Sequence, residues 1–141
     1  MQLSPYLLFN GDCEAAFKFY AEILGGKIEA MLSHVGTPAE EHVPAAWREK
    51  VLHARMTVAD SVLLASDAPP DRYQKPGGFS VSIQLADPED AERIFNALAD
   101  GGQIYMPFAE TFWAARFGML ADKFGIPWMI NCERPRQPPA P

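Results

Sequence analysis

The amino-acid sequence repeats one order of secondary-structure signals in its two halves. Residues 6–32 (YLLFNGDCEAAFKFYAEILGGKIEAML) resemble residues 82–108 (SIQLADPEDAERIFNALADGGQIYMPF), and an offset of 76 positions aligns Gly25-Gly26 with Gly101-Gly102. Each half contains a strand-like segment, an amphipathic segment, a Gly-Gly pair and a second strand-like segment. The repeat therefore predicts two modules of the same architecture.

The first amphipathic segment predicts a helix that begins near Asp12 and ends at Gly25. Aspartate is a favoured N-cap residue, and glycine readily takes the left-handed conformation that ends a helix. The apolar residues follow the spacing i, i+3, i+4, i+7, i+8, which places them in one buried stripe. They are Ala16, Phe19, Tyr20, Ile23 and Leu24.

The second helix is predicted between Asp87 and Gly101. Asp87 is the expected cap, Pro88 suits the first helical position, and the acids of DPED face the positive end of the helix dipole. The buried stripe of this helix is expected to consist of Ala91, Ile94, Phe95 and Leu98.

Each predicted helix is followed by further strands, so each half is expected to be βαβββ. Residues 51–67 and 115–132 each have the pattern of two strands around a turn. Residues 68–78 (APPDRYQKPGG) are rich in proline and glycine, which is typical of a linker. The predicted organisation is a first module over residues 1–67, a linker over 68–78, a second module over 79–133 and a frayed tail over 134–141.

Two such modules predict an α+β fold, in which a curled mixed sheet carries both helices on its outer face and lines a cleft with its inner face. The segment SVSIQL alternates in character. Val81, Ile83 and Leu85 should face the helix, and the remaining three side chains should face the cleft: Ser80, Ser82 and Gln84. The alternative is an ordinary sheet face in contact with water.

Composition excludes several classes of protein. The net charge of −6 argues against nucleic acid and anionic membranes as partners. No apolar run is long enough to span a bilayer. Cys13 and Cys132, without a signal peptide, are expected to be reduced thiols of a cytoplasmic protein.

The chain resembles the vicinal oxygen chelate superfamily of glyoxalase I, bleomycin-resistance proteins and extradiol dioxygenases, and within it the PhnB-like branch. The resemblance rests on PYLLFNGDCEAAFKFYAEILGG, HARMTVADSVLLASD and FWAARFGMLADKFGIPWMINCE, which together span residues 5–133. It implies the glyoxalase/bleomycin-resistance fold and a homodimer. Members of the PhnB-like branch carry the name 3-demethylubiquinone 3-methyltransferase, but the chain lacks the glycine-rich turn that S-adenosylmethionine enzymes use, so we do not expect methyl transfer.

The resemblance also implies where a metal would bind. In metal-dependent members the ligands come from the first, fourth, fifth and eighth strands, and these positions fall on Pro5, Leu64, Ser80 and Met129. Proline and leucine have no donor atom, a neutral hydroxyl is a weak ligand, and a thioether suits none of the metals that these enzymes use. We therefore expect no metal and no other cofactor.

Other chemistry-bearing residues are few. His34 and His42 fall in a predicted loop over residues 33–50 without ligand spacing, and His53 falls on a strand. Cys13 lies in the first turn of a predicted helix, where the dipole favours a thiolate, but a small buried residue is the simpler interpretation. No catalytic residue can be assigned.

Aromatic residues favour a small-molecule site. A cleft with aromatic walls and a few polar groups suits an organic ligand, although aromatic residues also build cores and dimer interfaces. Arg116 is a candidate partner for a ligand carboxylate or phosphonate. The predicted ligand-binding residues are Phe9, Leu64, Ser80, Ser82, Gln84, Trp113, Arg116 and Met129.

Two alternatives to this binding module remain. One is an enzyme, which is either a metal-dependent isomerase, lyase or dioxygenase-type enzyme with a displaced site, for which His53 is the candidate ligand, or a catalyst without a cofactor. The other is a structural or partner-binding dimer whose cleft is filled by its own side chains.

Overall fold

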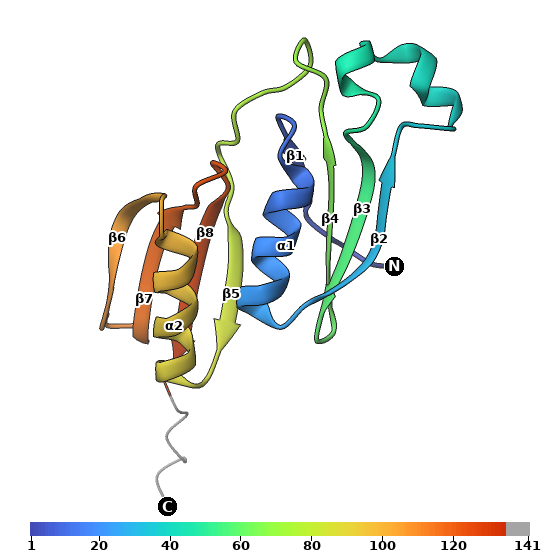
Figure 1. Ribbon diagram of the computed structural model, residues 1–141. Coiled ribbons are helices and arrows are strands. Elements are labelled where there is room, and N and C mark those ends of the chain that lie inside the picture. Colours follow the sequence, from blue (N-terminus) through green and yellow to red (C-terminus); the bar gives the residue numbers. More distant parts are fainter. Residues whose placement is uncertain (135–141) are drawn as a thin grey trace, which may run out of the picture. The chain divides into compact units, whose positions relative to one another are not determined.

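The computed structural model describes residues 1–134, and the predicted tail therefore lies outside the described residues except for Arg134. The chain divides into two compact units, and the boundary falls between Pro76 and Gly77, inside the predicted linker. Figure 1 shows the elements of each unit.

The first unit has the predicted βαβββ order. It contains β1 (Tyr6–Phe9), α1 (Cys13–Leu24), β2 (Lys27–Ser33), the short 3-10 helices η1 (Pro38–His42) and η2 (Ala45–Trp47), β3 (Val51–Val58) and β4 (Ser61–Asp67). The strands form one mixed sheet in the order β1-β4-β3-β2, in which β1 and β4 are parallel.

The second unit repeats this arrangement. It contains β5 (Val81–Leu85), α2 (Pro88–Ala99), β6 (Gln103–Ala109), β7 (Ala114–Ala121) and β8 (Pro127–Glu133). Its strand order is β5-β8-β7-β6, with β5 parallel to β8. The predicted α+β class and the two βαβββ modules are confirmed. In the described residues, no helix is long and apolar enough to cross a membrane.

Each helix buries an apolar stripe against one face of its own sheet. The stripe of α2 is the predicted one. The stripe of α1 differs, because Phe17 is buried whereas Phe19 and Leu24 are only half-buried. The buried residues of α1 are Cys13, Ala16, Phe17, Tyr20 and Ile23. We call the opposite side of each sheet its helix-free face.

The N-termini of the two helices are capped in different ways. Asp87 caps α2 as predicted, since its carboxylate accepts a hydrogen bond from the Glu89 N–H at 3.0 Å. Asp12 occupies the N-cap position of α1 as predicted, but its side chain forms no capping bond. The Cys13 N–H instead donates to Asp67 Oδ1 at 3.0 Å, so the start of α1 is held by the end of β4. Gly25 ends α1 with a φ of 67°, the left-handed conformation expected of it.

One buried aspartate organises each unit. Asp67 is 3% exposed and accepts N–H bonds from Gly11, Cys13 and Val51, which joins the β1–α1 turn, β3 and β4. Asp122 is equally buried and accepts from the backbone N–H of Phe124 and Ile126 and from Trp128 Nε1. Both carboxylates thus compensate their burial with hydrogen bonds.

Candidate functional site

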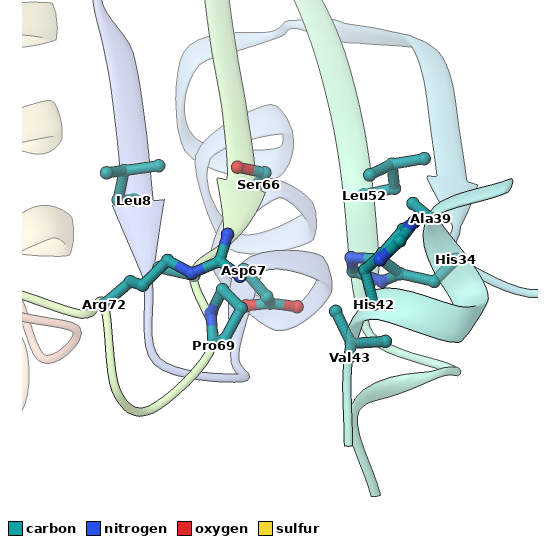
Figure 2. Close-up of a pocket in the computed structure, with 11 residues that line it drawn as sticks. Leu8, His34, Ala39, His42, Val43, Leu52, Ser66, Asp67, Pro69 and Arg72 are labelled. Carbon is teal, nitrogen blue, oxygen red and sulfur yellow. The ribbon is translucent and has the colours of Figure 1, made fainter. Parts of the chain in front are cut away.

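A pocket of about 330 Å³ opens on the helix-free face of the first sheet, at the end where β4 leaves it. Figure 2 shows its walls, which come from the sheet, from the loop between β2 and β3, and from the segment after β4. The lining residues are Leu8, His34, Ala39, His42, Val43, Leu52, Ser66, Asp67, Ala68, Pro69 and Arg72. The volume lies at the small end of the range of known ligand sites.

The base of the pocket is set by the register of the sheet. Leu8 of β1 lies opposite Ser66 of β4, so both side chains project from the helix-free face. Asp67 follows Ser66, but its three backbone bonds already occupy both oxygens. Asp67 therefore belongs to the scaffold of the pocket and has little capacity left for a ligand.

Three nitrogen-bearing side chains surround this base. His34 is 4% exposed, and its Nδ1 pairs with the Lys50 carbonyl oxygen at 3.0 Å, which leaves Nε2 as the ring nitrogen available to the pocket. His42, at the end of η1, and Arg72, after β4, are exposed. Within residues 1–134, neither side chain forms a hydrogen bond or an ion pair, so both can meet a ligand.

The structure places the two predicted ligand contacts of the first unit on opposite faces. Leu64 projects from the helix-free face, next to Tyr6. Phe9 does not, because it is 1% exposed and its ring lies 6.5 Å from that of Tyr20 on α1. Alternation along β1 gives the helix-free face to Leu8 instead, and Leu8 replaces Phe9 in the site.

The helix-free face of the second sheet carries a chain of polar contacts. Gln84 donates to the Ser82 hydroxyl at 2.7 Å and accepts from Asn131 Nδ2 at 2.6 Å. The Oδ1 atom of Asn131 is buried and has no hydrogen-bond partner within residues 1–134. Met129 shares this face through its pairing with Ser82, whereas Ser80 precedes the strand and is half-buried.

Arg116 lies on the other side of the second sheet from its predicted place. It is paired with Cys132, whose buried thiol faces α2 and lies 3.4 Å from the Ala86 carbonyl oxygen. Phe117 takes the helix-free face, and its ring lies 5.4 Å from that of Trp113. Simple alternation along β7 gives the helix side to Arg116 together with Gly118 and Leu120, whose partners Ile130 and Trp128 are buried.

Neither cysteine is a candidate nucleophile. Burial raises the pKa of the Cys13 thiol above its ordinary range, and the carboxylates of Asp67, Asp12 and Glu14 raise it further. Burial likewise raises the pKa of Cys132. A thiol that stays protonated is a poor nucleophile, so the simpler interpretation of Cys13 as a buried structural residue fits the structure.

Sequence reasoning missed most of the pocket. The predicted loop over residues 33–50 contains His34 and His42, and the predicted linker contains Arg72. These residues come together only because β2 and β4 end, and β3 begins, at the same end of the sheet. The signals in the sequence are a loop with two histidines and one tryptophan, and an arginine in the linker that follows the next two strands.

Comparison with known proteins identifies the family. Residues 1–131 match the family model described as 3-demethylubiquinone-9 3-methyltransferase. The chain belongs to this family. Its relative YjdN from Escherichia coli (strain K12) is 37% identical over 139 residues, which cover 93% of this chain and 95% of that protein.

Solved structures extend the comparison to the fold. Protein PA1353 from Pseudomonas aeruginosa is 47% identical, with a TM-score of 0.87 over 96% of this chain and 99% of that one. A Bacillus cereus PhnB protein is 22% identical, with a TM-score of 0.79 over 94% and 99%. The fosfomycin resistance protein FosX from Listeria monocytogenes is 12% identical, with a TM-score of 0.64 over 95% and 93%. The chain thus shares its fold with the PhnB protein and with FosX, in agreement with the resemblance to the vicinal oxygen chelate superfamily.

That superfamily implies a metal, and the residues at the corresponding positions do not fit one. On the helix-free faces, Tyr6 rather than Pro5 lies beside Leu64, and Ser82 lies beside Met129. Their donors are a phenol, a hydroxyl and a thioether, without an imidazole or carboxylate. The Tyr6 hydroxyl is 3.2 Å from His53 Nδ1, which pairs that histidine with a side chain. In residues 1–134, no group of three His, Cys, Asp or Glu side chains is placed to hold a metal ion.

Proposed function

We propose that this protein is a binding module that holds a small organic molecule in the pocket of its first unit. The observation that carries the proposal is the pocket itself, a cavity of about 330 Å³ with a largely apolar lining and a few polar groups at its edge. This combination is typical of small-molecule sites, in which apolar surface gives affinity and a few polar groups give orientation.

The donor chemistry favours binding over metal-dependent catalysis. A glyoxalase-type mechanism needs several strong ligands around one open coordination position. Leu64, Ser82 and Met129 offer no such set. Metal analysis of the purified protein tests the alternative, a metal-dependent isomerase, lyase or dioxygenase-type enzyme. A stoichiometric transition metal that is lost in a His53→Ala variant would favour that enzyme over the binding module.

A thermal-shift screen of metabolites and antibiotics tests the proposal. A ligand that binds only the folded state stabilises it by about 2.7 kcal/mol at a hundred times its Kd, so a true ligand raises Tm measurably. Ala39→Trp provides the negative control, because Ala39 is a half-buried residue of the pocket wall and an indole there would fill the cavity.

The matched variant is Ala46→Trp, which adds the same side chain to an exposed position of η2 outside the pocket. We expect the stabilising ligand to lose its effect in Ala39→Trp and to retain it in Ala46→Trp. A screen without any stabilising compound would count against the proposal. So would a ligand that stabilises both variants equally.

The same proposal includes a cytoplasmic homodimer and ligand contacts in the second unit. Edge strand β6 exposes Ile104, Tyr105 and Met106, with 50%, 58% and 40% of their surface accessible. Exposed apolar edges of this kind mark interaction surfaces. Light scattering should give twice the mass of 15.6 kDa, and a monomeric mass would remove the dimer from the proposal. Ser82, Gln84, Trp113 and Met129 stay proposed ligand contacts, to be tested by alanine substitution.

A further inference from the structure

The pocket in the first unit contains cationic and hydrogen-bonding side chains but offers no available carboxylate. Asp67 is the only acid in its lining, and both of its oxygens accept backbone N–H bonds. On the neighbouring loop, Glu40 accepts a hydrogen bond from the Gly36 N–H at 3.1 Å. A cationic ligand would therefore have to compete with three backbone N–H groups for the one carboxylate in the lining, although the chain as a whole has a net charge of −6.

Arg72 is the permanent charge of the pocket. In Figure 2 its side chain extends from the segment after β4 back across the mouth, toward Ser66 and Asp67. It forms no ion pair within residues 1–134, whereas Arg93 pairs with Asp90 and Arg134 pairs with Glu110. An unpaired guanidinium beside an apolar cavity is suited to bidentate recognition of a carboxylate, phosphate or phosphonate group.

The two histidines lie on the opposite side of the pocket in Figure 2. Because His34 Nδ1 lies 3.0 Å from the Lys50 carbonyl oxygen, which can only accept, Nδ1 carries the proton. In the neutral ring Nε2 is then an acceptor, and a hydrogen-bond donor on the ligand would satisfy it. His42 is exposed and can donate to the same ligand.

We infer that the pocket takes a small organic acid, whose oxyanion binds Arg72 and whose other end presents a hydrogen-bond donor to Nε2 of His34. Leu8, Leu52 and Val43 supply the apolar surface between the two ends. This inference rests on the proposed binding function and adds the charge and polarity of the ligand to it.

Three probes of one shape and different charge test the oxyanion. Benzoate, benzamide and benzamidinium are titrated into the ¹⁵N-labelled full chain, and the backbone amide signals of Ser66 and Ala68 report occupancy of the pocket. We expect benzoate to bind about tenfold more tightly than benzamide, since a hydrogen bond to a charged group contributes about 1.5 kcal/mol or more, and benzamidinium to bind weakest. Phenylphosphonate distinguishes a phosphonate preference from a carboxylate preference.

Arg72→Gln should weaken benzoate binding about tenfold and leave benzamide unchanged, because it removes only the charged contact. Arg93→Gln changes the net charge equally but lies on α2, outside the pocket, and should change neither affinity. Both arginines are exposed, so loss of folding is not expected in either variant.

The donor end is tested with 3-hydroxybenzoate and 3-methoxybenzoate. The hydroxyl compound should bind about fivefold more tightly, and His34→Asn should abolish that difference, because an asparagine amide can still donate to the Lys50 carbonyl oxygen but supplies no atom in place of Nε2. The amide spectrum of the His34→Asn variant verifies that it folds, because signals away from the pocket should match those of the unaltered protein.

Several results would overturn the inference. Benzamide or benzamidinium could bind as tightly as benzoate, Arg72→Gln could leave benzoate binding intact, or no probe could shift the pocket signals at millimolar concentration. An absent preference for the hydroxyl compound would remove the donor end. The proposed function would survive these results if the Ala39→Trp variant still blocked a neutral ligand found by screening, so the two failures are distinguishable.

Discussion

The buried carboxylate of Asp67 should be among the largest single contributions to the stability of the first unit. Its Oδ1 accepts the N–H groups of Gly11 and Cys13, each at 3.0 Å, and its Oδ2 accepts the Val51 N–H at 2.9 Å. Asp67→Asn preserves the size of the side chain but replaces one oxygen with an NH₂ group. The best rotamer keeps both bonds to Oδ1 and sets the new donor against the Val51 N–H.

The magnitude follows from the groups left without partners. The Val51 N–H and the new amide are both donors in a buried site, and a buried unsatisfied polar group costs about 1–3 kcal/mol. The remaining two bonds also lose the strength that a charged acceptor gives them. We expect the free energy of unfolding to fall by about 3 kcal/mol in total. With a urea m-value of about 2 kcal/mol per molar, the midpoint falls by about 1.5 M.

Urea titration followed by circular dichroism measures this change. Asp60→Asn is the matched control, because it makes the same chemical change at an exposed position of the β3–β4 turn, where about 0.5 kcal/mol or less is expected. A loss below about 1 kcal/mol for Asp67→Asn would refute the reasoning, since it would mean that the three N–H groups do not depend on this carboxylate.

Three further predictions concern packing, ionisation and the second aspartate. Gly118→Ala should lower the free energy of unfolding by about 1–3 kcal/mol in urea titration, because the added Cβ would lie 2.6 Å from Phe95. Gly77→Ala is the control and should be nearly neutral, because nothing lies within reach of its Cβ. Equal losses in the two variants would contradict the packing argument. Since folding raises the pKa of Cys13 above its ordinary value of 9.0, its contribution should be constant below about pH 9 and fall as pH rises further. Cys13→Ala should therefore reduce the alkaline loss of unfolding free energy, and an unchanged loss would contradict the assignment. Trp128→Phe should cost about 1–2 kcal/mol in thermal unfolding, because it deletes the 2.8 Å bond from Nε1 to Asp122, and an unchanged Tm would show that this bond is dispensable.

The fold could be predicted because it depends on local patterns. The stripe of α2, the Gly25 stop and the alternation of Val81, Ser82 and Ile83 each follow from the spacing of a few neighbouring residues. Two such sets of signals in the same order were enough to indicate two βαβββ modules.

The site was harder to predict for two reasons. The face that each strand residue occupies depends on the exact alternation along the strand, and the walls of the pocket come from loops. Phe9 lies on a four-residue strand, for which a shift of one residue exchanges the two faces, and the pairing of Arg116 with Cys132 places Arg116 on the helix side. The walls of the pocket come from segments that are adjacent only after the sheet forms. No spacing within the sequence relates His34 to Arg72.

Asp67 has a consequence for how the pocket can be altered. The same residue fastens three parts of the backbone and forms part of the cavity wall, so selection for a new ligand is constrained there by the need to fold. Ala39, His42 and Arg72 lie outside the strands and do not take part in that fastening. Directed evolution of ligand preference should therefore accumulate its successful substitutions around the mouth and leave the base unchanged.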